Sequence, residues 1–270
     1  RGTIGPVYDV DIIRRGDRFK PGLAFVDRTD ITLLQGQVGY GWFSPESSPV
    51  LRHLPTLSGT VYQRTSTGQV ESALAELNWY LRTKKQASAR LILDYNYEYL
   101  DRTYYVASEA YVPPGDYQFL DAYVYYSLPS GRLLGANGYV RGGAFYDGWR
   151  LTAQVRPTWR PNPYFMAGGR IKYDHVTFPE RNQEYINWIY KLDLQAAFSV
   201  TTSVAGLIQY NSAIDAVILN LRLRYNPREG TDLYLVYNDN LNLDRQREEP
   251  ALPLSSTRAV LLKYSITFLR

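Results

Sequence analysis

The sequence predicts an all-β protein, a transmembrane antiparallel up-and-down β-barrel of about 14 strands, with 12 to 16 as the range that ambiguous strand ends allow. Three observations lead to this fold class. Apolar and polar residues alternate along almost the whole chain of 270 residues. The alternating segments are long, and their aromatic and charged residues favour opposite faces.

The alternation begins weakly and is then continuous, whereas windows with helical spacing of apolar residues are rare. We expect residues 1–270 to form one barrel domain, with residues 1–30 leading into the main strands of residues 31–270. In chain order, the predicted strands are Tyr8 to Ile12, Val38 to Trp42, Thr56 to Arg64, Ala73 to Leu81, Ala89 to Tyr99, Leu120 to Leu128, Leu134 to Ala144, Trp149 to Trp159, Phe165 to Tyr173, Ile186 to Phe198, Val204 to Tyr210, Val217 to Tyr225, Leu233 to Tyr237 and Val260 to Phe268.

Strand length favours a membrane barrel. Most predicted strands have about 9 to 13 residues, whereas strands of soluble proteins usually have about 5 or 6 and a tilted membrane strand needs about 9 to 11. The longest apolar run, Ala122 to Tyr126, is far shorter than the roughly 18 residues of a membrane helix.

The two faces of the predicted strands differ in chemistry. Aromatic side chains gather at membrane interfaces, so we predict that the tryptophans on the apolar faces contact the interface; they are Trp42, Trp79, Trp149, Trp159 and Trp188. The opposite face carries mid-strand charges, as expected for a water-filled lumen. The alternative is a large soluble β-sandwich whose apolar face is a shared core.

Connections also alternate in length. The predicted short turns are Thr83 to Gln86, Pro129 to Arg132, Arg160 to Pro163, Thr201 to Ser203 and Asn226 to Thr231, and the long links are Asp101 to Asp116, Val176 to Glu184 and Asn238 to Ser256. If the last strand ends in the periplasm, these short turns are periplasmic and these long links are extracellular. The exception is Phe43 to Pro55, which is long and yet periplasmic by parity.

Composition excludes several classes of protein. The absence of Cys excludes disulfide frameworks and thiol chemistry. A net charge of +4 is too small to indicate nucleic-acid binding. The mean hydropathy of −0.34 would usually indicate a soluble protein, but 25 Tyr and 5 Trp do not fit that class. Because the chain begins at Arg1 without a secretory signal, we expect a fragment or a processed product.

Several segments together resemble a known family; they are Phe19 to Asp30, Val112 to Phe119, Gly143 to Arg150, Ile208 to Asp215, Asn220 to Asp239 and Leu261 to Arg270. They are similar to the C-terminal barrel of uncharacterised bacterial outer-membrane proteins that carry an N-terminal domain like family-nine carbohydrate-binding modules. The resemblance implies a Gram-negative outer membrane and a glycan-related context, and it implies no catalytic or ligand residues. It leaves open whether these strands close alone or form part of a larger barrel.

Candidate catalytic and metal sites are few, and we predict no enzyme, cofactor or metal. His53 is predicted in a link and His175 at a strand end, where an interfacial position is favoured over general-base chemistry. Asp94 and Glu98 lie roughly 13 Å apart on one strand, which exceeds the spacing of glycosidase carboxylates. The stretch from Asn238 to Asp244 lacks the Gly and Glu of a calcium loop, so a hydrophilic extracellular loop is expected.

Lumen charge is the feature most informative about function. The predicted lumen cations are Arg90, Arg141, Arg156, Arg170, Lys172, Lys191, Arg222, Arg224 and Lys263, against the acids Asp94, Glu98, Asp174 and Asp193. Since rings of Arg and Lys favour anions, we predict a porin-like passive pore or uptake channel with a mildly anion-selective lumen, whose solutes the resemblance would make glycan-derived. The alternatives are a barrel that anchors or sheathes a partner protein, and a glycan- or lipid-acting enzyme.

Predicted partners follow from the location. They are the lipid bilayer, the outer-membrane assembly machinery and a periplasmic or lumen-bound protein. Tyr264, Ile266 and Phe268 form the alternating apolar ending that barrels commonly present for assembly, although Leu269 and Arg270 follow it.

Overall fold

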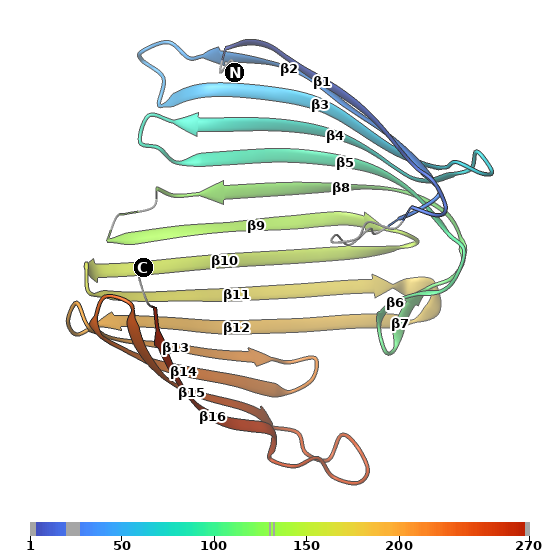
Figure 1. Ribbon diagram of the computed structural model, residues 1–270. Helices are drawn as coiled ribbons and strands as arrows, with labels where there is room; N and C mark the ends of the chain where they lie inside the picture. Colours follow the sequence, from blue (N-terminus) through green and yellow to red (C-terminus); the bar gives the residue numbers. More distant parts are fainter. Residues whose placement is uncertain (1–3, 20–27, 130, 132, 268–270) are drawn as a thin grey trace. The chain divides into compact units, whose positions relative to one another are not determined.

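The computed structural model describes residues 4–19, 28–129, 131 and 133–267. Fourteen strands follow one another in a single antiparallel up-and-down sheet, and a two-stranded hairpin, β6–β7, is inserted after β5 (Figure 1). The predicted all-β fold and its strand count are therefore confirmed. The elements are β1 (Gly5–Arg15), β2 (Ile31–Phe43), β3 (Val50–Arg64), β4 (Val70–Thr83), β5 (Ser88–Leu100), β6 (Tyr104–Ala107), β7 (Ala110–Val112), β8 (Gly115–Ser127), β9 (Leu134–Phe145), β10 (Gly148–Asn162), β11 (Phe165–Phe178), the 3₁₀ helix η1 (Pro179–Arg181), β12 (Gln183–Ala197), β13 (Thr202–Asn211), β14 (Ala216–Arg228), β15 (Thr231–Asn242) and β16 (Ser255–Ile266).

The chain divides into two compact units, which are described separately below. Unit 1 comprises Arg1–Ser127, Tyr139–Thr152 and His175–Tyr185. Unit 2 comprises Leu128–Gly138, Ala153–Asp174 and Ile186–Arg270. The strands of the large sheet have 10 to 15 residues. They equal or exceed the roughly 9 to 11 residues that a tilted strand needs to cross a bilayer.

The predicted long link from Phe43 to Pro55 is wrong. β2 runs to Phe43 and β3 starts at Val50, so Pro55 lies within a strand. The β2–β3 register runs through Gly39↔Thr56 and resumes at Trp42↔His53, on either side of Pro55, which has no N–H to donate. A Cβ on Gly39 would lie 2.6 Å from the Pro55 carbonyl oxygen, so glycine permits this close approach. The connection between β2 and β3 is therefore limited to residues 44–49, and it is no longer a long periplasmic link that departs from the predicted alternation of connection lengths.

Two further predicted links are also corrected. β11 continues to Phe178 and η1 leads directly into β12 at Gln183, so the long link from Val176 to Glu184 is replaced by a tight connection. β15 continues to Asn242, so only residues 243–254 connect it to β16. Most of the stretch from Asn238 to Asp244, predicted as a hydrophilic loop, is therefore part of β15. Phe268, most of Phe19 to Asp30, and parts of the turn Pro129 to Arg132 lie outside the described residues.

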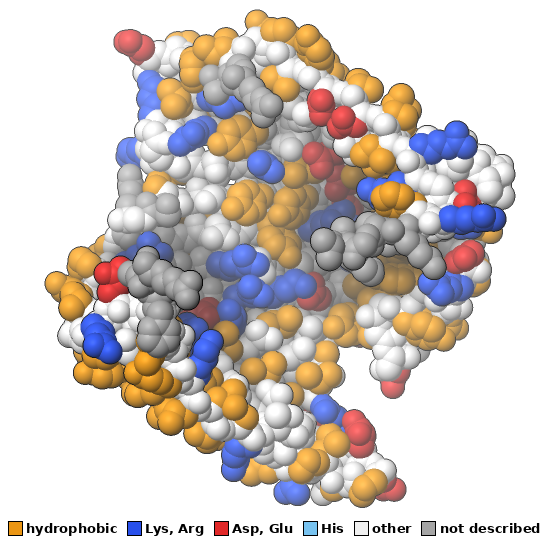
Figure 2. Space-filling view, in the orientation of Figure 1, with side chains coloured by type: hydrophobic (Ala, Val, Ile, Leu, Met, Phe, Trp, Pro, Cys, Tyr) orange, Lys and Arg blue, Asp and Glu red, His pale blue; other side chains and the backbone are white. Residues whose placement is uncertain are grey.

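In many strands, large apolar side chains are exposed on one face and buried polar side chains lie on the other. In β12, Ile186, Trp188 and Leu192 are exposed, whereas Asn187 is buried. In β8, Leu120 and Val124 are exposed, whereas Asp121 is 1% exposed. We call the face with exposed apolar side chains the outer face and the opposite one the inner face. Hydrophobic side chains spread over the visible surface accordingly (Figure 2). A soluble protein shows the reverse arrangement.

No helix within the described part of the chain has the length and apolar character needed to span a membrane.

Candidate functional site

Strand parity places all nine predicted lumen cations on the inner face, but they are unevenly divided between the units. Two belong to unit 1, namely Arg90 and Arg141. Seven belong to unit 2, namely Arg156, Arg170, Lys172, Lys191, Arg222, Arg224 and Lys263. The inner face of unit 1 also carries Asp121, Glu76 and Arg150, which were not predicted. The excess of positive charge is therefore a property of unit 2.

An ion cluster braces the inner face of unit 1. The buried carboxylate of Asp121 accepts hydrogen bonds from Nε of Arg141 at 2.9 Å and from Nη2 at 3.1 Å, and it also pairs with Arg150. Arg141 reaches Asp94 at 3.1 Å as well. Gly143 makes this packing possible, because a Cβ there would lie 2.6 Å from Cα of Asp121. Arg141 thus holds the wall together, and its charge is already matched by two carboxylates.

The sequence contained a usable signal for the missed members of this cluster. In β8, Asp121 lies on the same face as Phe119 and Tyr123, and Leu120 and Ala122 lie on the opposite, outer face. This alternation alone places Asp121 on the inner face. Arg150 directly follows Trp149 in β10. Because Trp149 is on the outer face, the same alternation places Arg150 on the inner face.

The hairpin β6–β7 covers part of the inner face of unit 1. Its Ala110 and Val112 are fully buried against Val176 and Phe178 of β11. Figure 1 shows the hairpin beside the connection from β11 to β12. The link from Asp101 to Asp116 is therefore not a free extracellular loop, because its middle folds onto the wall.

Arg181 of η1 fastens this hairpin. Its guanidinium pairs with Asp147, donates to the carbonyl oxygen of Tyr111 at 2.9 Å, and lies 4.6 Å from the ring centre of Phe178. The hydrogen bond to Asp147 raises the pKa of Arg181, so the guanidinium stays protonated across the physiological range. The adjacent Tyr146, in the β9–β10 turn, has its pKa raised to about 12 by burial.

We expect Arg181→Ala to release the hairpin without unfolding the sheet. The loss of a charge-assisted hydrogen bond of about 1.5 kcal/mol should speed hydrogen exchange at the Tyr105 and Tyr111 amides by about tenfold. Hydrogen exchange with mass spectrometry on the protein in lipid nanodiscs measures this. Arg102→Ala, an exposed arginine in the same link, is the matched control. Equal exchange in both variants would contradict the role of Arg181.

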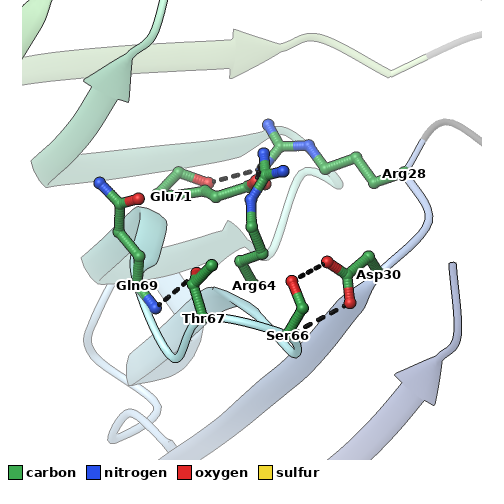
Figure 3. A network of polar contacts seen from close by, with 8 residues as sticks. Arg28, Asp30, Arg64, Ser66, Thr67, Gln69 and Glu71 are labelled. Atoms are coloured by element: carbon green, nitrogen blue, oxygen red, sulfur yellow. Dashed lines mark hydrogen bonds and ion pairs between the residues drawn. The ribbon is translucent and has the colours of Figure 1, made fainter.

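A second polar network lies where the chain enters β2 (Figure 3). Asp30 accepts a hydrogen bond from the Ser66 amide at 3.1 Å, and Glu71 pairs with Arg64. Arg28 donates to Ser72 at 3.0 Å and lies 4.6 Å from the ring centre of Tyr62. The network ties the β3–β4 turn to the residues that precede β2.

Three of the seven predicted cations on the inner face of unit 2 form ion pairs with carboxylates. Lys172 pairs with Asp174 at 2.6 Å, Lys191 with Asp193 at 3.0 Å, and Arg224 with Asp232 at 2.7 Å. Within the described parts of the chain, no carboxylate forms an ion pair with the four remaining cations, Arg156, Arg170, Arg222 and Lys263. Seven basic residues thus face three acidic ones, Asp174, Asp193 and Asp232.

The five predicted interface tryptophans are all exposed on the outer face, with exposed fractions from 37% to 61%. In unit 1, Trp42 stacks on His53 at 5.0 Å, and His53 lies 5.9 Å from Trp79. In unit 2, Trp188 lies 4.5 Å from Tyr173 and 5.8 Å from Tyr190. These ring contacts form aromatic bands on the outer face, near the end of β2 for Trp42 and in the middle of β12 for Trp188 and Tyr190, and contact with a membrane interface stays a prediction.

The histidines do not assemble a catalytic group. His53 lies in β3 and not in a link; its Nε2 is 2.9 Å from Ser44 Oγ, and its neighbours are tryptophans. His175 Nε2 contacts Glu184 at 2.7 Å across β11 and β12. Glu98 lies on β5 with Asp94, and Asp239, in the predicted loop, pairs with Arg258 at 2.8 Å. Among the described residues, no cluster of three or more His, Asp or Glu could hold a metal ion.

Comparisons with known proteins add little. No family model and no curated protein matches the chain, so the family resemblance stays a prediction. Similar solved structures include a NanC porin, which is 13% identical; the match covers 73% of this chain and 94% of that chain, with a TM-score of 0.32. At this level of similarity, no property of the porin is transferred to this chain.

Proposed function

We propose that this chain is an outer-membrane β-barrel that acts as a passive channel and prefers anions. The observation that carries the proposal is the reversed polarity of its strands: large apolar side chains are exposed on the outer face, whereas buried polar side chains such as Asp94, Asp121 and Asn187 lie on the inner face. Such a surface is stable when lipid covers the outer face and water reaches the inner one.

The spacing of the aromatic bands supports a bilayer location. On adjacent strands of unit 2, Tyr210 pairs with Val217, and Tyr225 follows eight residues later on the same face of β14. Eight residues span about 26 Å along the strand, or about 20 Å along the membrane normal at a tilt of about 40°, which fits within the apolar band of roughly 25 Å on outer-membrane barrels. The bilayer and the outer-membrane assembly machinery are the partners that this location requires.

Anion preference is assigned to the inner face of unit 2. Its seven cations outnumber its three acids, and fixed positive charge on a pore wall raises the local concentration of anions. Glycan-derived solutes rest on the family resemblance alone. No enzymatic role is proposed, because the histidines and carboxylates have structural partners.

The test is conductance in planar bilayers. We expect stable conductance and a reversal potential, under a KCl gradient, that indicates chloride preference. Replacing Arg222 and Arg224 with Gln should reduce that preference because two of the seven cations are lost. Arg247→Gln, in the β15–β16 connection, is the control for loss of charge away from the wall and should leave the preference unchanged.

Two results would count against the proposal. Conductance without anion preference removes the assigned selectivity. No conductance from pure protein, with a second protein found in the lumen of native preparations, would favour the anchoring or sheathing barrel instead.

A further inference from the structure

A cavity of about 420 Å³ lies on the inner face of unit 2, lined by the start of β11, the end of β12, the start of β13, and residues of β14 and β15. Its volume is within the range of small-molecule sites. The cavity results from a change in side-chain size between adjacent strands. In two neighbouring cross-strand rows, Ala205 pairs with Arg222 and Ser203 pairs with Arg224. The short side chains form a floor, and the two arginines stand beside it.

The arginines give this cavity a specific chemistry. Arg222 and Arg224 are two residues apart on one strand, so their Cα atoms are separated by roughly 6.6 Å on the same face. Arg224 is fixed by Asp232 at 2.7 Å, and its guanidinium lies 6.0 Å from the ring centre of Tyr234. Among the described residues no carboxylate pairs with Arg222, so it contributes an uncompensated positive charge to the wall.

The remaining lining suits the body of an organic ligand. Met166 and the ring of Tyr234 offer apolar contact, and Gln195 adds one polar amide, in register with Ala205 across β12 and β13. Guanidinium groups bind planar or tetrahedral oxyanions through paired hydrogen bonds. The two arginines fit an anionic head group. The small side chains of the floor leave room for an organic body of about one ring.

We propose that this cavity is a binding site for a small organic oxyanion, a carboxylate or phosphate monoester with a body of about one ring. Arg222 and Arg224 hold the oxyanion, and the body lies over Ser203 and Ala205. The site deepens the proposed channel function, since it would make the flux of such solutes saturable, although binding itself does not require conduction.

The experiment is equilibrium dialysis of the protein in nanodiscs against radiolabelled benzoate and phenyl phosphate, with neutral benzamide as the uncharged probe. We expect saturable binding of at least one of the two anions and none of benzamide. Arg222→Gln should weaken binding by tenfold or more. Ala205→Leu should abolish it by filling the floor, while both arginines remain.

The control is Arg247→Gln, which removes one positive charge outside the cavity and should bind as the unaltered protein does. Binding of benzoate alone identifies a carboxylate site, and binding of phenyl phosphate alone identifies a phosphate site. The proposal is overturned if neither anion binds, if benzamide binds equally well, or if Arg222→Gln and Ala205→Leu bind normally. If the protein conducts with anion preference but binds neither anion, the binding site is rejected and the proposed channel stands. If it binds an anion but does not conduct, the binding site stands and the proposed channel is rejected.

Discussion

Replacing Asp121 with Leu should lower the free energy of unfolding by about 3–5 kcal/mol, the largest loss expected for a single substitution in this chain. Asp121 is 1% exposed, and its carboxylate accepts hydrogen bonds from Arg141 and pairs with Arg150. Its removal leaves two guanidinium groups on the inner wall with only Asp94 nearby. The measurement is urea titration of the protein in lipid vesicles, followed by tryptophan fluorescence.

The matched control is Asp193→Leu. Asp193 also pairs with an inner-face cation, Lys191 at 3.0 Å, but both side chains are partly solvent-exposed. An exposed ion pair contributes about 0–1 kcal/mol, so this variant should unfold nearly as the unaltered protein does. Equal losses for the two variants would show that the cluster around Asp121 has no special structural role.

The double variant Asp121→Leu with Arg141→Leu distinguishes two causes of the lost stability, the unpaired charge of Arg141 and the lost packing of Asp121. If the loss comes from unpaired charge, removing Arg141 together with its partner should recover part of the stability. An additive loss would place the cost in packing against Gly143 instead.

The strands could be predicted from the sequence because their apolar and polar residues alternate over many consecutive positions. In β12, for example, Ile186, Trp188 and Leu192 share a face by parity alone, and the structure exposes all three. Pro55 misled the prediction because proline usually ends a strand, whereas here Gly39 permits its carbonyl to approach and the register resumes at His53.

The interior arrangement could be predicted only in part. Parity places a side chain on the inner face but does not identify its partner. Arg141 was therefore predicted as a lumen cation, whereas its hydrogen bonds with Asp121 were not predicted. The β6–β7 hairpin was missed for a different reason. Its strands have four and three residues, and the burial of Val112 depends on Phe178, far away in sequence. Strands this short, held by contacts between distant residues, show no alternation of apolar and polar residues that a sequence analysis could detect.

The two neighbouring residues Leu261 and Leu262 give the most direct test of which face meets lipid. Both are exposed, at 54% and 71%, but they lie on opposite faces of β16. Leu262 is in register with Leu235 on the outer face, and Leu261 shares the inner face with Lys263. Leu262→Arg should cost about 2–4 kcal/mol in lipid vesicles, because a charge on the lipid face of a barrel strand is destabilising by that amount near mid-membrane.

Leu261→Arg makes the same chemical change one residue away and should cost little, because it adds one more cation to a wall that water reaches. Urea titrations of both variants in vesicles measure the difference directly. In a water-soluble sandwich with this exposure, both substitutions would be tolerated within about 0.5 kcal/mol. A large loss for Leu261→Arg with none for Leu262→Arg would invert the assignment of the faces. Since the two variants share strand, depth and side-chain change, only the environment of each face can separate them.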